Sequence, residues 1–133
     1  MKVFLGGTCN GSTWRNKLIP FLTIDYFNPV VDDWTPECQA EEIKQRETCD
    51  IVLYCITPKM TGVYSIAEVV DDSNKRPEKT VLALYKEDFG VTFDDHQWKS
   101  LKSVAKMVFD NGGVIFIDED ANSIADYLNN KKP

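Results

Sequence analysis

The apolar residues of this chain gather in five short runs that are separated by longer, amphipathic stretches. The runs "DIVLYCIT" (50–57) and "KTVLALY" (79–85) are continuous and rich in β-branched residues, a pattern typical of strands that are buried on both faces. Three shorter runs cover residues 2–7, 24–31 and 114–118, and we expect them to be strands as well. The pattern therefore predicts five strands.

The stretches between these runs carry helix signals. Residues 35–49 begin with Thr35 at the N-cap position and Pro36 at the first helical position, which is a strong helix start. Residues 94–113 place apolar side chains on one side and end in two glycines. The three other predicted helices cover 11–22, with Ser12 as N-cap and a kink or end at Pro20, then 63–72 and 122–130.

Strands that alternate with helices indicate βαβ units and a parallel sheet that is covered on both faces. Five such strands predict an α/β fold with a flavodoxin-like, doubly wound five-stranded parallel sheet, and 133 residues fit a single domain over 1–133. Ligands of such sheets bind beyond the carboxyl ends of the strands, where the strand order reverses. The segments expected at that edge are 6–12, 28–34, 57–68 and 85–90, whereas the polar stretch 71–79 is expected to be a solvated loop.

Composition narrows the choice of partners. A net charge of −6 argues against nucleic acid or an anionic membrane as the main partner, since both require clustered cations. No apolar run is long enough to span a membrane, and the apolar stretch at the N-terminus is too short for a signal-peptide core, so we expect a cytoplasmic protein. Four cysteines without a Cys-x-x-Cys pair, together with a single histidine, predict reduced thiols and no metal site.

The first predicted strand leads through residues 6–15 into a helix, where free backbone N–H groups favour anions. This loop lacks the dinucleotide-binding glycine spacing and the P-loop lysine. A tight turn with Ser12 as a cap is therefore as consistent with the sequence as a ligand site. Arg15 is an ordinary surface residue on one interpretation, and on another it holds a phosphate or a carboxylate at the ligand edge.

Glu68 stands in the helix that follows the central strand, in the stretch "GVYSIAEVVDD" (62–72). A solvated acid near a helix start is its ordinary interpretation. Its neighbours are apolar, however, and Gly62 and Ser65 are small enough to leave room for a ligand beside the backbone. A carboxylate at this edge of the sheet could attack an electrophilic carbon or stabilise a cation.

Three groups of residues together resemble a known family: "VFLGGT" with "GSTWR" (3–15), "YFNPVVDDW" (26–34) and "CDIVLYCITPKMTGVYSIAEVVD" (49–71). They are similar to the nucleoside 2-deoxyribosyltransferase superfamily, most closely to its nucleoside 2-deoxyribosyltransferase-like branch of bacteria and phages. The similarity covers roughly residues 2–85. Its most specific part is the order of strand, loop, glycine, small residues and glutamate over 50–68.

The resemblance implies an enzyme in which Glu68 is the nucleophile. It would attack the anomeric carbon of a 2′-deoxynucleoside, expel the base, and pass the sugar from a deoxyribosyl-enzyme ester to another base, or to water in hydrolase relatives. The chemistry is similar to that of retaining glycosidases, with an oxocarbenium-like transition state. The relatives need no cofactor and act as homo-oligomers in which a neighbouring chain often helps to close the pocket.

Other family positions correspond less fully. Glu42 falls at the place of a family acid that would fix the sugar or orient Glu68, although a solvated helix face suits it equally. Many family members carry an Asp shortly before the nucleophile. This chain has no Asp around Thr61, where that residue would fall, and Asp32 or Asp33 could substitute for it. The transferases carry a Tyr in the first strand, and this chain has Phe4 there. Tyr64 could supply a phenol in its place.

The predicted site consists of two carboxylates, Glu68 and Glu42, and a set of substrate-binding residues. These are Gly6, Gly7, Thr8, Ser12, Arg15, Asp33, Trp34, Met60, Gly62 and Tyr64. Trp34 is a candidate platform for stacking a base, although aromatic residues at such junctions more commonly pack in a core.

Three hypotheses follow for the function. The first is transfer of deoxyribose between bases through Glu68. The second is hydrolysis of a nucleoside monophosphate, with the first loop, Ser12 and Arg15 on the phosphate. The third is a nucleotide-binding module that keeps the fold without catalysis.

Overall fold

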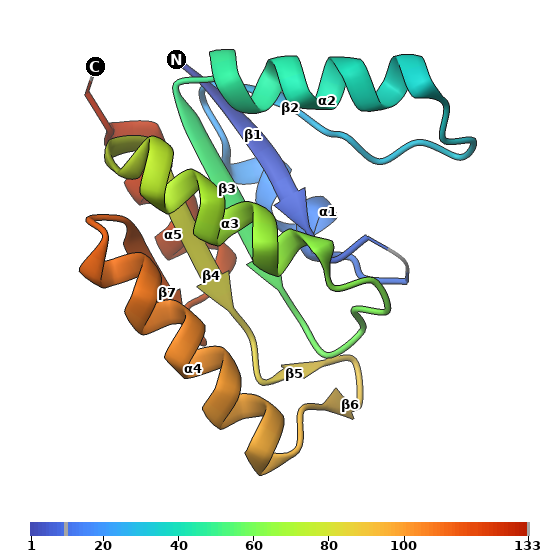
Figure 1. Ribbon diagram of the computed structural model, residues 1–133, viewed down its shortest axis with the longest axis vertical. Coiled ribbons are helices and arrows are strands. Elements are labelled where there is room, and N and C mark those ends of the chain that lie inside the picture. Colours follow the sequence, from blue (N-terminus) through green and yellow to red (C-terminus); the bar gives the residue numbers. More distant parts are fainter. Residues whose placement is uncertain (10, 133) are drawn as a thin grey trace.

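The computed structural model describes residues 1–9 and 11–132 and contains a five-stranded parallel sheet between two layers of helices (Figure 1). The strand order is β2-β1-β3-β4-β7, with every neighbouring pair parallel. The strands are β1 (Lys2–Gly7), β2 (Asp25–Phe27), β3 (Ile51–Ile56), β4 (Thr80–Leu84) and β7 (Val114–Ile117). This order is that of a flavodoxin-like sheet, so the predicted fold class is confirmed.

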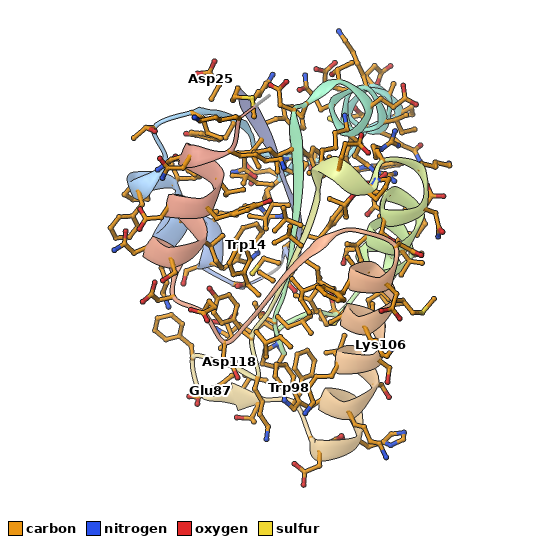
Figure 2. The ribbon with its side chains drawn as sticks, turned by 90° about the vertical axis from the view of Figure 1, so that its left-hand side faces the viewer. Trp14, Asp25, Glu87, Trp98, Lys106 and Asp118 are labelled. Carbon is orange, nitrogen blue, oxygen red and sulfur yellow. The ribbon has the colours of Figure 1, made fainter. Side chains whose placement is uncertain are left out.

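Helices cover both faces of the sheet, as Figure 2 shows in a view along its edge. On one side lie α2 (Pro36–Thr48), α3 (Tyr64–Lys75) and α4 (Asp95–Asp110), and on the other lie α1 (Trp14–Leu18) and α5 (Ala121–Asn130). Alternate residues of β3 enter the two cores. Tyr54 packs toward α3 and α4, whereas Leu53 and Cys55 pack toward α1 and α5. This two-sided burial explains why the strand run contains so few polar residues.

The start of α2 forms as predicted. Thr35 is the N-cap and its side chain accepts a hydrogen bond from the backbone N–H of Cys38 at 3.2 Å, with Pro36 at the first helical position. The prediction for residues 11–22 is wrong in its bounds. Helix α1 begins only at Trp14, its N-cap is Thr13 rather than Ser12, and the chain continues as a 3₁₀ helix, η1 (Ile19–Phe21), around Pro20.

The expected solvated loop over 71–79 is also wrong. Helix α3 continues to Lys75 and a 3₁₀ helix, η2 (Pro77–Lys79), follows it. Asp72 and Ser73 are fully buried because the helix turns Asp72 toward Arg46 of α2 and Ser73 toward Asn111 at the end of α4. A second feature was not predicted: residues 85–92 contain a small antiparallel hairpin of β5 (Glu87–Asp88) and β6 (Val91–Thr92).

Candidate functional site

A cleft of about 290 Å³ opens at the carboxyl ends of β1 and β3. The chain leaves these neighbouring strands toward opposite edges of the sheet, so the strand order reverses between them. The walls of the cleft come from the loop after β1, the loop between β2 and α2, helix α2, and the start of α3. The cleft therefore lies at the edge that the sequence pattern predicts for a ligand.

Most of the predicted site residues line this cleft. Both predicted carboxylates do so, Glu42 from α2 and Glu68 from α3. The predicted substrate-binding residues that line it are Gly6, Gly7, Thr8, Arg15, Trp34, Met60, Gly62 and Tyr64. Segments far apart in the sequence are thus brought to one place by the parallel sheet, and the roles assigned to them stay predictions.

Two predicted site residues lie elsewhere. The Ser12 hydroxyl donates a hydrogen bond to Asp88 in the β5–β6 hairpin at 2.7 Å, which holds it away from the cleft lining. Asp33 is exposed on the loop before α2, as is Asp32, and neither belongs to the cleft lining that the structure describes. Asn10, which falls inside the predicted first loop, lies outside the described residues.

The glycines of the cleft are present for different structural reasons. A Cβ atom on Gly7 would lie 2.1 Å from the carbonyl oxygen of Cys55, and the residue has a φ of +110°. A Cβ atom on Gly6 would lie 2.8 Å from the Phe4 ring. Gly7 is thus required by the close approach of β1 to the backbone of β3, and Gly6 by the Phe4 and Tyr54 rings that pack beside it. Gly62 is different, because among the described residues no heavy atom lies within 4 Å of its Cβ position, so it leaves the cleft open.

Thr8 and Arg15 form a buried frame beneath the cleft. The Arg15 guanidinium donates to the carbonyl oxygen of Leu5 at 3.0 and 2.9 Å and to that of Thr8 at 2.7 Å. The Thr8 hydroxyl accepts from the backbone N–H of Thr57 at 3.0 Å and thereby joins the ends of β1 and β3. Burial lowers the pKa of Arg15, which remains a cation. Arg15 places a positive charge at the cleft, and each of its three nitrogens donates one hydrogen bond to a main-chain carbonyl.

Glu68 is the fifth residue of α3, and its side chain is only 12% exposed. Its Oε2 lies 3.3 Å from Nη1 of Arg46 in α2. Burial raises the pKa of Glu68 to about 7, Arg46 opposes that rise, and the charges of Glu42 and Asp72 add to it. A carboxyl group with this pKa changes protonation state near neutral pH, which is typical of groups in functional sites.

Arg46 belongs to an ionic cluster that the sequence analysis missed. The cluster consists of Arg46, Asp72, Tyr54 and Arg76. Asp72 is completely buried and accepts from Arg46 Nε at 3.2 Å, from Arg46 Nη2 at 3.0 Å and from Arg76 Nε at 2.9 Å, and also from the Tyr54 hydroxyl. The spacing was a usable signal, since Glu42 and Arg46 are four residues apart on one helix, and Glu68 and Asp72 on another.

Glu42 is half-buried in the same cleft. Burial raises its pKa, while the positive charges of Arg46 and Arg15 lower it. The cleft therefore holds two carboxyl groups near two arginines. A carboxylate and a nearby cation in a partly dry cleft can attack, orient or stabilise a reacting carbon that acquires positive charge.

The mouth of the cleft is apolar. Trp34 is 61% exposed and Tyr64 is 72% exposed, and the neighbouring Val30 and Val31 are exposed as well. The expectation that Trp34 packs in a core is therefore wrong, because the β2–α2 loop carries its ring outside both cores. Phe4, by contrast, is buried and stacks on Phe27 with ring centroids 5.9 Å apart. Exposed rings at a cleft mouth suit the stacking of a planar group.

Among residues 1–9 and 11–132, no cluster of three or more His, Cys, Asp or Glu is arranged to hold a metal ion. Within the same residues, no helix combines the length and the apolar character needed to cross a bilayer.

Comparison with known proteins relates the chain to a family. A family model described as "Nucleoside 2-deoxyribosyltransferase like" matches residues 1–86. That stretch contains strands β1 to β4 and all the residues that line the cleft. A search of curated proteins finds no match to the chain.

Proposed function

Because the chain belongs to the nucleoside 2-deoxyribosyltransferase-like family, we propose that it cleaves the N-glycosidic bond of a 2′-deoxynucleoside and transfers the sugar to another base. The observation that carries this proposal is the placement of Glu68. Its carboxyl group is largely buried, stands beside Arg46, and lines an open cleft at the switch point of the sheet. The proposed nucleophile is the ionised form of this group.

The proposed reaction has two displacements at the anomeric carbon. A Glu68 oxygen attacks this carbon, and the base leaves with the electron pair of the N-glycosidic bond and gains a proton. A nitrogen of the second base then attacks the same carbon, releases Glu68 and gives up its own proton, which balances the proton that the first base gained. Both transition states carry positive charge on the sugar, which a carboxylate stabilises directly. A deoxysugar favours this route because it lacks the electron-withdrawing 2-hydroxyl group.

Neighbouring residues have supporting roles in this proposal. Arg46 keeps Glu68 in place and lowers its pKa, so that more of it is ionised at neutral pH. Glu42 lines the same cleft and would fix the sugar. The exposed rings of Trp34 and Tyr64 at the mouth would hold the base by stacking.

The arrangement favours a nucleoside over its 5′-phosphate as substrate. The phosphate hypothesis relies on Ser12 and Arg15, but Ser12 is hydrogen-bonded to Asp88 and the Arg15 guanidinium binds two main-chain carbonyls. A phosphate in this cleft would also meet the charges of Glu42 and Glu68. We therefore expect turnover of deoxynucleosides to exceed that of the corresponding monophosphates.

The test is an incubation of the protein with deoxynucleosides and with their 5′-phosphates, each with and without a second free base, followed by chromatography of the bases and nucleosides. Transfer predicts a new nucleoside only when the second base is present. Glu68→Gln should abolish turnover, whereas Glu78→Gln, at an exposed acid outside the cleft, should leave it unchanged. Full activity of Glu68→Gln would refute the proposed mechanism.

The same assay separates catalysis from binding alone. If no substrate turns over while calorimetry detects a deoxynucleoside bound to the protein, the chain is a binding module rather than an enzyme. If free base appears at the same rate with and without the acceptor, the reaction is hydrolysis.

A further inference from the structure

A second cavity, of about 400 Å³, lies on the opposite face of the sheet from the Glu68 cleft. It opens between α1, the start of α5 and the β5–β6 hairpin. Three aromatic side chains line it: Trp14 from α1, Tyr85 from the end of β4, and Phe89 from the hairpin turn. Figure 2 shows Trp14 on the α1 and α5 side of the sheet, with Glu87 of the hairpin below it. A mainly apolar cavity of this size is large enough for a small organic molecule.

Phe89, whose ring lies at the opening of this cavity, has an unfavourable backbone conformation. Phe89 and Gly90 form the two-residue turn between β5 and β6, and both have positive φ values, +46° and +82°. Turns of this type strongly favour Asn-Gly, and a bulky residue at the first position is rare. The Phe89 ring gains little burial in return, since the residue is 67% exposed. Strain of this kind occurs most often where it serves a function.

Cations and acids are arranged around the opening. Lys17 Nζ lies 4.5 Å and Lys59 Nζ 5.2 Å from the centroid of the Phe89 ring, so two ammonium groups contact the ring at the opening. The lining itself includes Glu87, Asp88 and Asp120, with Lys17 as its cation. The Ser12 hydroxyl fixes Asp88 at 2.7 Å, and a carboxylate retains further acceptor capacity after one hydrogen bond.

These features specify the ligand's chemistry. Phe89 is exposed at the opening and Tyr85 is partly exposed, so these two rings can contact a flat molecule, whereas Trp14 is only 7% exposed. The surplus of carboxylates opposes a phosphate and favours N–H donors. We propose that this second cavity binds a planar heteroaromatic molecule that carries amino groups, the chemical class that includes adenine and cytosine.

The two sites share a frame but are separate. The Trp14 indole N–H, in the second cavity, donates to the carbonyl oxygen of Thr8 at 2.8 Å, and Thr8 lines the Glu68 cleft. No residue lines both sites in the part of the chain that the structure describes. Binding in the second cavity does not depend on the proposed transfer reaction, so either proposal can fail without the other.

The test is an NMR titration of the ¹⁵N-labelled protein with free adenine, hypoxanthine, cytosine and uracil. Adenine and cytosine should shift the amides of residues 85–92 and 120–124, and each should bind about ten-fold more tightly than hypoxanthine or uracil, which lack the exocyclic amino group. A ligand that occupies the Glu68 cleft would instead shift residues 60–68. Shifts confined to 60–68, or equal affinity for all four bases, would overturn the proposal.

Two variants sharpen the result. Phe89→Asn creates the favoured Asn-Gly turn, so it should raise Tm by a few degrees and weaken adenine binding about ten-fold through loss of the ring. Ala121→Phe should fill the cavity and abolish binding, whereas Asn122→Phe, at the exposed neighbouring position, should leave it unchanged. Unchanged affinity in the more stable Phe89→Asn protein would contradict the site, because that variant cannot be dismissed as misfolded.

Discussion

Helix α3 carries two buried acids, four residues apart, whose surroundings differ sharply. Asp72 is completely buried and accepts hydrogen bonds from Arg46, Arg76 and Tyr54. Glu68, one turn earlier, lines an open cleft and has an ion pair with Arg46 at 3.3 Å. The same arginine therefore contacts both acids, with its shorter contacts directed to Asp72.

The two environments distinguish a structural acid, Asp72, from an acid that is suited to chemistry, Glu68. The charge of Asp72 is satisfied by strong, charge-assisted hydrogen bonds, so it holds α2 and α3 together. Burial dominates the environment of Glu68 and raises its pKa to about 7. A carboxylate that the fold stabilises less is a better nucleophile, because it loses less when it forms a bond to carbon.

The largest expected effect on stability is that of Asp72→Asn. This change leaves Arg46 and Arg76 without their buried partner, so the free energy of unfolding should fall by about 3 to 5 kcal/mol. Urea denaturation at pH 7 measures it. Asp71→Asn is the matched control, because Asp71 is half-exposed with ion pairs of about 1 kcal/mol or less. Equal effects of the two changes would contradict the structural role of Asp72.

Glu68→Gln should raise the free energy of unfolding, whereas Asp72→Asn should lower it. Glu68 has an ordinary pKa of 4.5 when unfolded and about 7 when folded, so folding favours its protonated form. Its ionisation costs stability as pH rises from about 4.5 to 7. Glutamine does not ionise, so the variant should be about 3 kcal/mol more stable than the wild type at pH 8, and equally stable below pH 4.5. A variant that is less stable at pH 8 would show that the Arg46 contact outweighs burial.

The pH dependence of turnover should follow the same group. Only ionised Glu68 can attack, so kcat/KM should fall about ten-fold per pH unit below a pKa of about 7 and level off above it. Steady-state rates between pH 5 and 9 measure this limb. If kcat/KM instead begins to fall only near pH 4.5, the cleft does not raise the pKa of Glu68.

The smallest effect is expected for Arg46→Lys. Lysine keeps a positive charge near Glu68 but loses the paired hydrogen bonds to Asp72, so stability should fall by about 1 to 2 kcal/mol. The pH below which kcat/KM falls should change little, because the positive charge is retained. Arg46→Gln removes the charge that lowers the pKa of Glu68, so it should move that pH upward. Identical pH profiles for the lysine and glutamine variants would show that Arg46 does not tune Glu68.

The local sequence pattern was sufficient to predict those elements of the fold that depend mainly on residues close together in the chain. Continuous apolar runs predicted β3 and β4 to within a residue or two, and Thr35 with Pro36 predicted the start of α2. The alternation of strands and helices then placed Glu68 at the ligand edge, because parallel strands bring their carboxyl ends to one side.

Contacts between distant segments depend on how the helices pack against each other. The sequence shows acids and arginines at four-residue spacing on two helices, but it does not show that Arg46 meets Asp72 and Glu68. It likewise did not determine that Ser12 reaches Asp88 or that Trp34 remains exposed. The reason is physical: apolar periodicity records burial along one element, whereas a buried charge depends on which side chains the packing of other elements brings within reach.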